Sequence, residues 1–427
     1  MQRHRSSLAL VAALAAVVGL GLLLAGCGGG GSDDNTLRWF IFNEPGGGPQ
    51  QAARQCSQQS NGRYQIEFDF LPADADGQRE QLVRRLGAED STIDIIGMDV
   101  IWTGEFANAG WIEEWTGQQA DAVSQGVFDS VLETARYEGR LYAAPIWTNT
   151  QLLWYRSDRV DQPPETWDEM IEEGVRLEEN GEGGRIQVQA DRYEGLVVWA
   201  NALIASAGTE ILSGPEQIDL AEGPTEDALA IMGRIARSPA AAPDISTSDE
   251  DSGRLAFQDG GSAFMVNYPF VHPSAKEEAP NVFKNMDAAP YPRVEAGRQS
   301  APPLGGINLA VSSFSDNKEL AFEAIECLIQ PENQIAIAEA GGLPPVLEEL
   351  YDRPVIEEIY PGFVEILREA IETAVPRPSQ SPAYQDLSLA IQRSLHPPAD
   401  IDPEDPAPTY DRLRDYVQQA VDVEGLL

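Results

Sequence analysis

LRWFIF at residues 37–42, YQIEFDFL at 64–71 and IDIIGMDV at 93–100 are the segments that decide the fold. The first and third are short apolar runs and the second alternates apolar with polar residues, so all three are predicted strands. Between them, Gln50–Gln59 and Gln78–Glu89 have the apolar spacing of helices. Strands that alternate with helices at this spacing predict right-handed crossovers and a largely parallel sheet. The expected fold class is therefore α/β.

The loops that follow two of these strands carry polar side chains. Asn43 and Glu44 follow the first strand, and Asp99 lies at the end of the third. In open sheets of this kind, ligands collect beyond the carboxyl ends of the strands. Asn43, Glu44 and Asp99 are therefore candidate ligand-binding residues at one rim of the sheet.

The charge of the chain limits its partners. Its 427 residues include 69 acidic and 29 basic side chains, which gives a formal charge of -40 at pH 7. Such a chain repels phosphate backbones and anionic lipid headgroups, which disfavours nucleic acid as a partner and adhesion to a membrane through a basic patch. Hydrophobic residues make up 42% of the chain, which is typical of a globular protein rather than of a disordered one.

The first 26 residues are predicted to be a signal peptide. Arg3 and Arg5 form a short basic head. Leu8–Leu24 is an apolar and glycine stretch that is too short and too abruptly ended for a stop-transfer helix. A retained membrane helix is the alternative.

A lipid anchor is predicted where this stretch ends. LAGC at 24–27 resembles the bacterial lipobox, in which the cysteine, here Cys27, carries diacylglycerol. Residues 27–35 would then form a lipidated flexible tether. The predicted location is the extracytoplasmic face of the bacterial cell membrane, where acyl chains rather than charge hold the protein.

Two further cysteines, Cys56 and Cys327, each lie in a segment with a helical pattern. An exported chain meets an oxidising compartment, where an even number of cysteines favours a disulfide. The alternative is a pair of buried thiols that pack as small apolar residues. From the residues alone, both interpretations stay open.

Metal sites and catalytic signatures receive little support from the sequence. His272 and His396 are each followed by proline, and no Cys or His cluster has zinc spacing. SDNK at 315–318 satisfies Ser-x-x-Lys, but we interpret it as a polar loop that caps a helix starting at Lys318. No cofactor motif is present. A glycosidase is not excluded, since it needs only two carboxylates at the correct separation.

The rest of the chain alternates further helices and strands. A Thr-x-x-Glu capping box at 166–169 opens a helix that is predicted to run to about Glu179. Tyr193–Ala207 is a predominantly apolar helix. Pro397–Pro408 is expected to be an acidic, exposed segment before the terminal helix.

Several short motifs occur in an order and spacing that resemble those of a known family. They are DIIGMD (94–99) with Trp102, AGWI (109–112), GRLYAAP (139–145), LWYR (153–156), PETWDE (164–169), Lys318-Glu319 and GGLP (341–344). Together with the lipobox, they are similar to motifs of the family 1 extracellular solute-binding proteins, the sugar receptors of ABC importers. The resemblance covers nearly the whole mature chain.

This resemblance implies a two-lobed fold like that of the class II periplasmic binding proteins, with hinge crossings and a ligand cleft between the lobes. Lobe 1 would take residues 36–146 and 304–346, and lobe 2 would take residues 147–303 and 347–427. Cys56 and Cys327 then fall in the same lobe, which supports the disulfide. The implied partners are permease subunits with a cytoplasmic ATPase, and the receptor is expected to be a monomer.

Within the family, the chain most resembles trehalose-binding lipoproteins, through FNEP (42–45), GMDVIWT (97–103), WTNTQLLWYR (147–156), FMVNYPF (264–270) and AVPRP (374–378). The ligand-binding residues implied by this resemblance are Asn43 with its neighbour Glu44, Asp99, Asn149, Glu250, Tyr268 and Arg377. Where a tryptophan is expected, the chain has Tyr268. The aromatic platform is therefore smaller and gains a hydroxyl.

The same residue types suit a neutral sugar on chemical grounds. Carboxylates, amides and a guanidinium can form paired hydrogen bonds with hydroxyls, while an aromatic face covers C–H patches. Structural alternatives are a capping role for Asp99, a hinge role for Asn149 and core packing for Tyr268.

The sequence therefore predicts a lipid-anchored receptor for a neutral di- or oligosaccharide such as trehalose, with no enzymatic activity, cofactor or metal. Two alternatives remain open. One is an extracytoplasmic lipoprotein glycoside hydrolase. The other is a receptor for another small solute, a peptide or a polyamine, on the same fold.

Overall fold

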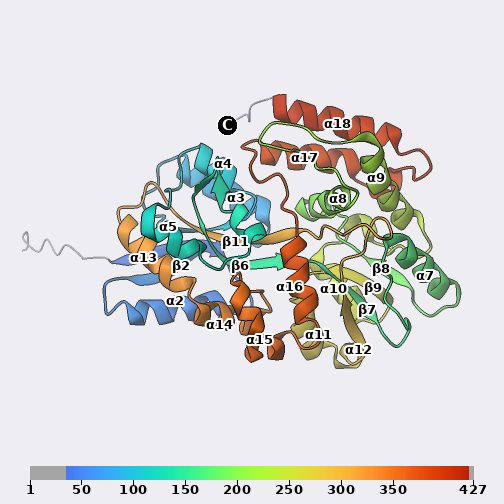
Figure 1. The fold of residues 1–427 in the computed structure, drawn as a ribbon, viewed down its shortest axis with the longest axis horizontal. Coiled ribbons are helices and arrows are strands. Elements are labelled where there is room, and N and C mark those ends of the chain that lie inside the picture. The colour runs from blue at the N-terminus through green and yellow to red at the C-terminus, as the bar shows by residue number, and fades with distance from the viewer. Residues whose placement is uncertain (1–34, 423–427) are drawn as a thin grey trace, which may run out of the picture. The chain divides into compact units, whose positions relative to one another are not determined.

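The computed structural model describes residues 35–422, which form an α/β structure with two main sheets (Figure 1). The five-stranded sheet has the order β2-β1-β3-β11-β6, with β1 (Thr36–Phe42), β2 (Gln65–Leu71), β3 (Ile95–Asp99), β6 (Ala144–Thr150) and β11 (Leu304–Val311). The four-stranded sheet has the order β10-β7-β9-β8, with β7 (Leu152–Arg156), β8 (Arg185–Gln187), β9 (Ser262–Asn267) and β10 (Met286–Ala289). A hairpin pairs β4 (Arg136–Tyr137) with β5 (Arg140–Leu141).

The three strands predicted near the start of the chain are confirmed as β1, β2 and β3. The helices between them are α2 (Gly48–Gln59) and α3 (Ala75–Leu86), and each begins a few residues before its predicted start. The remaining helices before β7 are α4 (Thr103–Asn108), α5 (Gly117–Ser124) and α6 (Asp129–Glu133).

The later helices fall into two sequence blocks. Those before β11 are α7 (Trp167–Glu179), α8 (Glu194–Ser206), α9 (Glu222–Arg237), α10 (Glu250–Gln258), α11 (Val271–Glu278) and α12 (Pro280–Phe283). Those after it are α13 (Lys318–Leu328), α14 (Pro331–Gly341), α15 (Pro354–Ile359), α16 (Val364–Thr373), α17 (Tyr384–Leu395) and α18 (Ala407–Asp422). Within residues 35–422, no helix is both long enough and apolar enough to cross a membrane.

The expectation of a largely parallel sheet is confirmed for β1, β3 and β6 of the five-stranded sheet, which run in one direction, and fails at β11. β1 and β3 are parallel, but β11 is antiparallel to both of its neighbours, β3 and β6. The reason is connectivity, because β11 follows β10 of the other sheet and enters through a long crossing rather than through a local β–α–β unit. The handedness rule for such units therefore does not apply to it.

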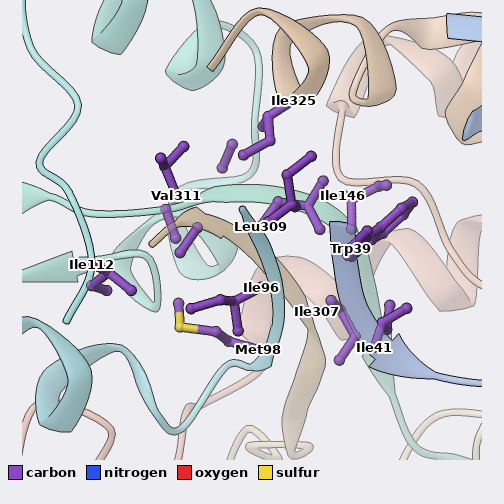
Figure 2. Close-up of a cluster of buried hydrophobic side chains, with 14 of the residues drawn as sticks. Trp39, Ile41, Ile96, Met98, Ile112, Ile146, Ile307, Leu309, Val311 and Ile325 are labelled. Atoms are coloured by element: carbon purple, nitrogen blue, oxygen red, sulfur yellow. The ribbon is translucent and has the colours of Figure 1, made fainter. Parts of the chain in front are cut away.

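The five-stranded sheet buries one apolar cluster against its helices. Trp39 of β1, Ile96 of β3, Leu309 of β11 and Ile325 of α13 belong to this cluster and are all fully buried (Figure 2). Alternation along the strands directs these side chains into the core. The cluster therefore packs strands from distant parts of the chain around β3, whose last residue is Asp99.

Cys56 and Cys327 form a disulfide and are not two separate buried thiols. The disulfide joins Cys56 of α2 to Cys327 of α13, with the two sulfur atoms 2.06 Å apart. Because α2 also packs against α14, the bridge fastens a helix near the start of the chain to helices that follow β11.

The predicted capping box is confirmed at the start of α7. The backbone N–H of Glu169 donates to Thr166 Oγ1 at 3.1 Å, and the backbone N–H of Thr166 donates to Glu169 Oε2 at 3.3 Å. The helix ends at Glu179 as expected.

The expectation that Pro397–Pro408 is an exposed segment is wrong for its first part. Pro398 is buried and Ile401 is fully buried in the apolar cluster that also contains α9 and α18 side chains. Gly233 of α9 permits this approach, because a Cβ there would lie 2.6 Å from the Ile401 carbonyl oxygen. Ile401, an apolar residue among prolines and acids, thus anchors this segment to the core.

His272 of α11 is buried among aromatic rings. Its ring centroid lies 6.2 Å from that of Trp154 and 5.1 Å from that of Phe363. Burial lowers the pKa of His272 to about 4, and the positive charge of Lys276 contributes to the shift.

We expect this histidine to make the protein less stable in acid. The pKa of His272 in the folded state lies below its ordinary value, so the neutral ring stabilises the fold above about pH 6.5. This contribution to the free energy of unfolding, about 3 kcal/mol in all, is lost as the pH falls toward 4. Urea unfolding of the parent and of His272→Phe across this range tests the expectation. The parent should lose stability relative to the variant as the pH falls, and a constant difference would contradict the assignment.

Candidate functional site

Asn43 and Asp99 lie at one edge of the five-stranded sheet, as predicted. β1 and β3 run parallel, with Phe40 paired to Ile96. Asn43, which follows β1, and Asp99, the last residue of β3, therefore lie at the carboxyl ends of neighbouring strands. Asp99 Oδ1 accepts a hydrogen bond from the backbone N–H of Ile101 at 3.2 Å. This is a capping contact, and it leaves the carboxylate partly exposed.

Arg377 connects the end of β3 to the start of α8. It lies between α16 and α17, is flanked by Pro376 and Pro378, and is 4% exposed. Its Nη2 donates to Asp99 Oδ1 at 3.2 Å, and its Nη1 donates to Glu194 Oε1 at 2.6 Å. One buried guanidinium therefore joins the end of β3 to the start of α8.

Glu194 belongs to this candidate site, although the sequence did not predict it. It is the first residue of α8, and its buried carboxylate also accepts hydrogen bonds from Ser388 Oγ at 2.6 Å and from the Tyr384 hydroxyl. Burial raises the pKa of Glu194, while Arg377 and the two hydroxyl donors oppose the shift. An acid in the first turn of a helix is ordinarily explained by the helix dipole. No pattern in the sequence sets Glu194 apart, and it stands out only because the structure buries nearly all of α8.

Glu250 lies at the start of α10, beside the end of β9. The Asn267 side chain donates from Nδ2 to the Glu250 backbone carbonyl at 2.9 Å, which ties the two elements together. Glu250 Oε2 accepts a hydrogen bond from the Tyr193 hydroxyl at 2.6 Å. Burial raises the pKa of Glu250, and the Tyr193 hydrogen bond opposes the rise.

Tyr268 follows β9 and lies within electrostatic reach of the other charged residues. Burial is the largest cause of its raised pKa, Glu250 and Asp99 raise the pKa further, and Arg377 lowers it. The structure therefore brings together Asp99, Glu250, Tyr268 and Arg377, which come from distant parts of the sequence.

Asn149 and Gln151 lie where the chain passes from β6 to β7. Gln151 is the single residue between these strands, and its Nε2 donates to Gln189 Oε1 at 2.9 Å. Its amide also influences the pKa of Tyr268, which places it beside that side chain. Asn149 Oδ1 and Gln151 Oε1 are buried, and neither has a hydrogen-bond partner within the described part of the chain. Asn149 was predicted from the sequence, whereas Gln151 was not.

Asn43 and Glu44 make local contacts instead. Gln50 Nε2 donates to Asn43 Oδ1 at 3.1 Å, and the backbone N–H of Gly47 donates to Glu44 Oε2 at 2.9 Å. Glu44 is buried, and a Cβ on Gly341 would lie 2.7 Å from its Oε1. Among residues 35–422, no hydrogen bond links Asn43 or Glu44 to the other five predicted ligand residues. Glu44 therefore holds the loop shape, and ligand binding by this pair stays a prediction.

The predicted lipid attachment lies outside the described residues. This holds for the signal peptide at 1–26, for Cys27 and for residues 27–34 of the tether.

Comparisons with known proteins identify the family and the fold of the chain. A family model described as bacterial extracellular solute-binding protein matches residues 50–335. The probable ABC transporter-binding protein of Deinococcus radiodurans is 28% identical over 347 residues, which cover 78% of this chain and 81% of that protein. The maltotriose-binding protein of Pyrococcus abyssi is 26% identical over 314 residues, which cover 70% of this chain and 65% of that protein.

A solved structure shows the same fold. Maltose-bound MalE3 of T. maritima superposes with a TM-score of 0.80 at 24% identity, covering 90% of this chain and 98% of that chain. The fold is thus the two-lobed α/β fold of the periplasmic binding proteins. Because the family model matches more than half of the chain, the protein belongs to the bacterial extracellular solute-binding proteins and is a solute-binding protein of ABC transport, not an enzyme.

Proposed function

We propose that the protein binds a neutral di- or oligosaccharide, a disaccharide such as trehalose, between its two lobes and delivers it to an ABC permease. The observation that carries this proposal is a set of buried polar atoms that have no partner among the described residues, namely Asn149 Oδ1, Gln151 Oε1 and Arg377 Nε. The two oxygens need a donor and the nitrogen needs an acceptor. A sugar hydroxyl both donates and accepts, so the hydroxyls of a polyol can supply either kind of partner.

The charges in the candidate site favour a neutral ligand over an anion. The Arg377 guanidinium is already paired with Asp99 and Glu194, and the Glu250 carboxylate lies nearby. Because this guanidinium is already paired with carboxylates, it does not favour an anionic solute. Tyr268 adds an aromatic face that can cover C–H groups.

The proposed function includes closure of the two lobes around the sugar and attachment of the protein to the membrane. A sugar that touches Asp99 on one side and Glu250 and Tyr268 on the other would stabilise a closed state, which a permease can recognise. The lobes proposed are residues 36–146 with 304–346 and residues 147–303 with 347–427, and Cys27 is the proposed lipid attachment. The names of the maltotriose-binding relative and of the maltose-bound structure support a sugar ligand.

Isothermal titration calorimetry of the purified protein with trehalose, maltose and maltotriose tests this function. At least one sugar should bind with a dissociation constant of about 10 μM or lower. Asn149→Leu and Gln151→Leu should each weaken that binding by about tenfold, because each removes an acceptor from a buried hydrogen bond. Failure of all three sugars to bind would contradict the proposal.

A further inference from the structure

Arg377 has two acidic partners that differ in how firmly they are held. The Glu194 contact measures 2.6 Å and the Asp99 contact 3.2 Å. The Glu194 side chain is 11% exposed, whereas the Asp99 side chain is 24% exposed. Hydrogen bonds between charged groups strengthen as they shorten and as water is excluded, so Glu194 is the stronger partner.

The surroundings of Glu194 reinforce this difference. Its Oε1 accepts from Arg377 and from the Tyr384 hydroxyl, and its Oε2 accepts from Ser388 Oγ. Both carboxylate oxygens of Glu194 therefore bind groups in the segment that carries Arg377 or in α17, the helix that follows it. Asp99 instead reaches Arg377 from the end of β3, and the same oxygen that binds Arg377 also accepts the Ile101 backbone N–H.

We infer that Glu194 is the positioning residue that holds Arg377 in place, and that Asp99 is the partner whose contact with Arg377 a ligand hydroxyl takes over. Glu194 does not touch the ligand. It fixes the planar guanidinium, so that the Nε and the nitrogen facing Asp99 point in a set direction. Rigid placement before binding lowers the entropic cost of binding. This inference rests on the proposed function only where ligand affinity is concerned.

The anchoring can be tested without any ligand, by double-mutant cycles on the unfolding equilibrium. The single variants are Glu194→Gln, Asp99→Asn and Arg377→Met, and each acid variant is also combined with Arg377→Met. The coupling between Glu194 and Arg377 should exceed about tenfold in the unfolding equilibrium constant, and that between Asp99 and Arg377 should stay below about threefold. Equal couplings, or a larger one for Asp99, would overturn the inference.

Sugar titration then tests the consequence for binding. Glu194→Gln should weaken binding of the tightest sugar by about 10- to 100-fold, and it should have little further effect in an Arg377→Lys background, where the fork geometry is already lost. An equal loss in both backgrounds would show that Glu194 acts independently of Arg377 and would overturn the positioning role. A purely structural role would lower stability without this dependence on residue 377.

A surface variant provides the control. Glu173 binds Arg176 through two hydrogen bonds of 2.8 and 2.7 Å on the exposed face of α7, so Glu173→Gln removes a similar ion pair away from the site. Its sugar affinity should stay within about twofold of the parent. If the parent binds no sugar, the proposed function fails, while the unfolding cycles still decide whether Glu194 positions Arg377.

Discussion

Arg377→Met is expected to lower the free energy of unfolding by about 3–5 kcal/mol near neutral pH. The arginine is 4% exposed, and methionine fills part of its volume without its charge. Asp99 and Glu194 then face each other with no cation between them. Breaking a buried ion pair by removing one partner is costly because the remaining charge stays desolvated. Chemical denaturation of parent and variant measures the loss.

The loss should also depend on pH in a defined direction. Burial already raises the pKa of Glu194, and without Arg377 one of the effects that oppose this rise is gone. A carboxyl with a raised folded pKa stabilises the protein at low pH and loses that contribution as the pH rises through the folded pKa. The deficit of Arg377→Met should therefore be larger near pH 8 than near pH 5.

Arg353→Met is the matched control for this substitution. Arg353 is 40% exposed and pairs with Glu349 at 3.3 Å one helical turn away. An exposed pair of this kind contributes less than about 1 kcal/mol, so this variant should unfold nearly as the parent does. Similar losses for Arg377→Met and Arg353→Met would contradict a buried link at Arg377.

Removal of the disulfide is expected to cost about 3–5 kcal/mol of stability. Cys56 and Cys327 are separated by 271 positions, and a crosslink that closes so long a loop removes much conformational freedom from the unfolded chain. The variant is the double substitution Cys56→Ser with Cys327→Ser, because a single substitution leaves a reactive thiol. Denaturant unfolding measures the change in stability.

Reductant provides an internal control for the bridge. The parent in excess dithiothreitol should unfold at the lower denaturant concentration of the double variant, and the double variant should not respond to reductant. A parent that keeps its full stability after its thiols are shown to be free would contradict the expected contribution.

Much of the five-stranded sheet could be predicted from local pattern. LRWFIF and IDIIGMDV are apolar runs of strand length, and the structure places them as adjacent parallel strands. The insertion of β11 between β3 and β6 could not be predicted this way, since periodicity carries no information about which distant strand becomes a neighbour. The burial of Ile401 could not be predicted either, because it depends on a contact with α9, which is distant in the sequence.

The residues of the candidate site could likewise be predicted only in part. Asp99, Tyr268 and Arg377 lie in short motifs that the family resemblance could carry over, and the structure brings them together with Glu250. Glu194 and Gln151 escaped because their roles depend on partners that only folding supplies, Arg377 for the first and Gln189 for the second. A glutamine between two apolar strands and an acid at the head of an apolar helix are ordinary in sequence, and become informative only once buried.

The place of β11 also sets an order of events in folding. It pairs with β3 on one side and β6 on the other, yet it follows both by a long stretch of chain. The five-stranded sheet therefore cannot be completed until residue 311 has been synthesised, and pairings of such long sequence separation form slowly. The N-terminal strands of this sheet therefore lack their partner β11 until about three quarters of the chain has been made, and in a chain predicted to be exported this leaves them incomplete for most of synthesis.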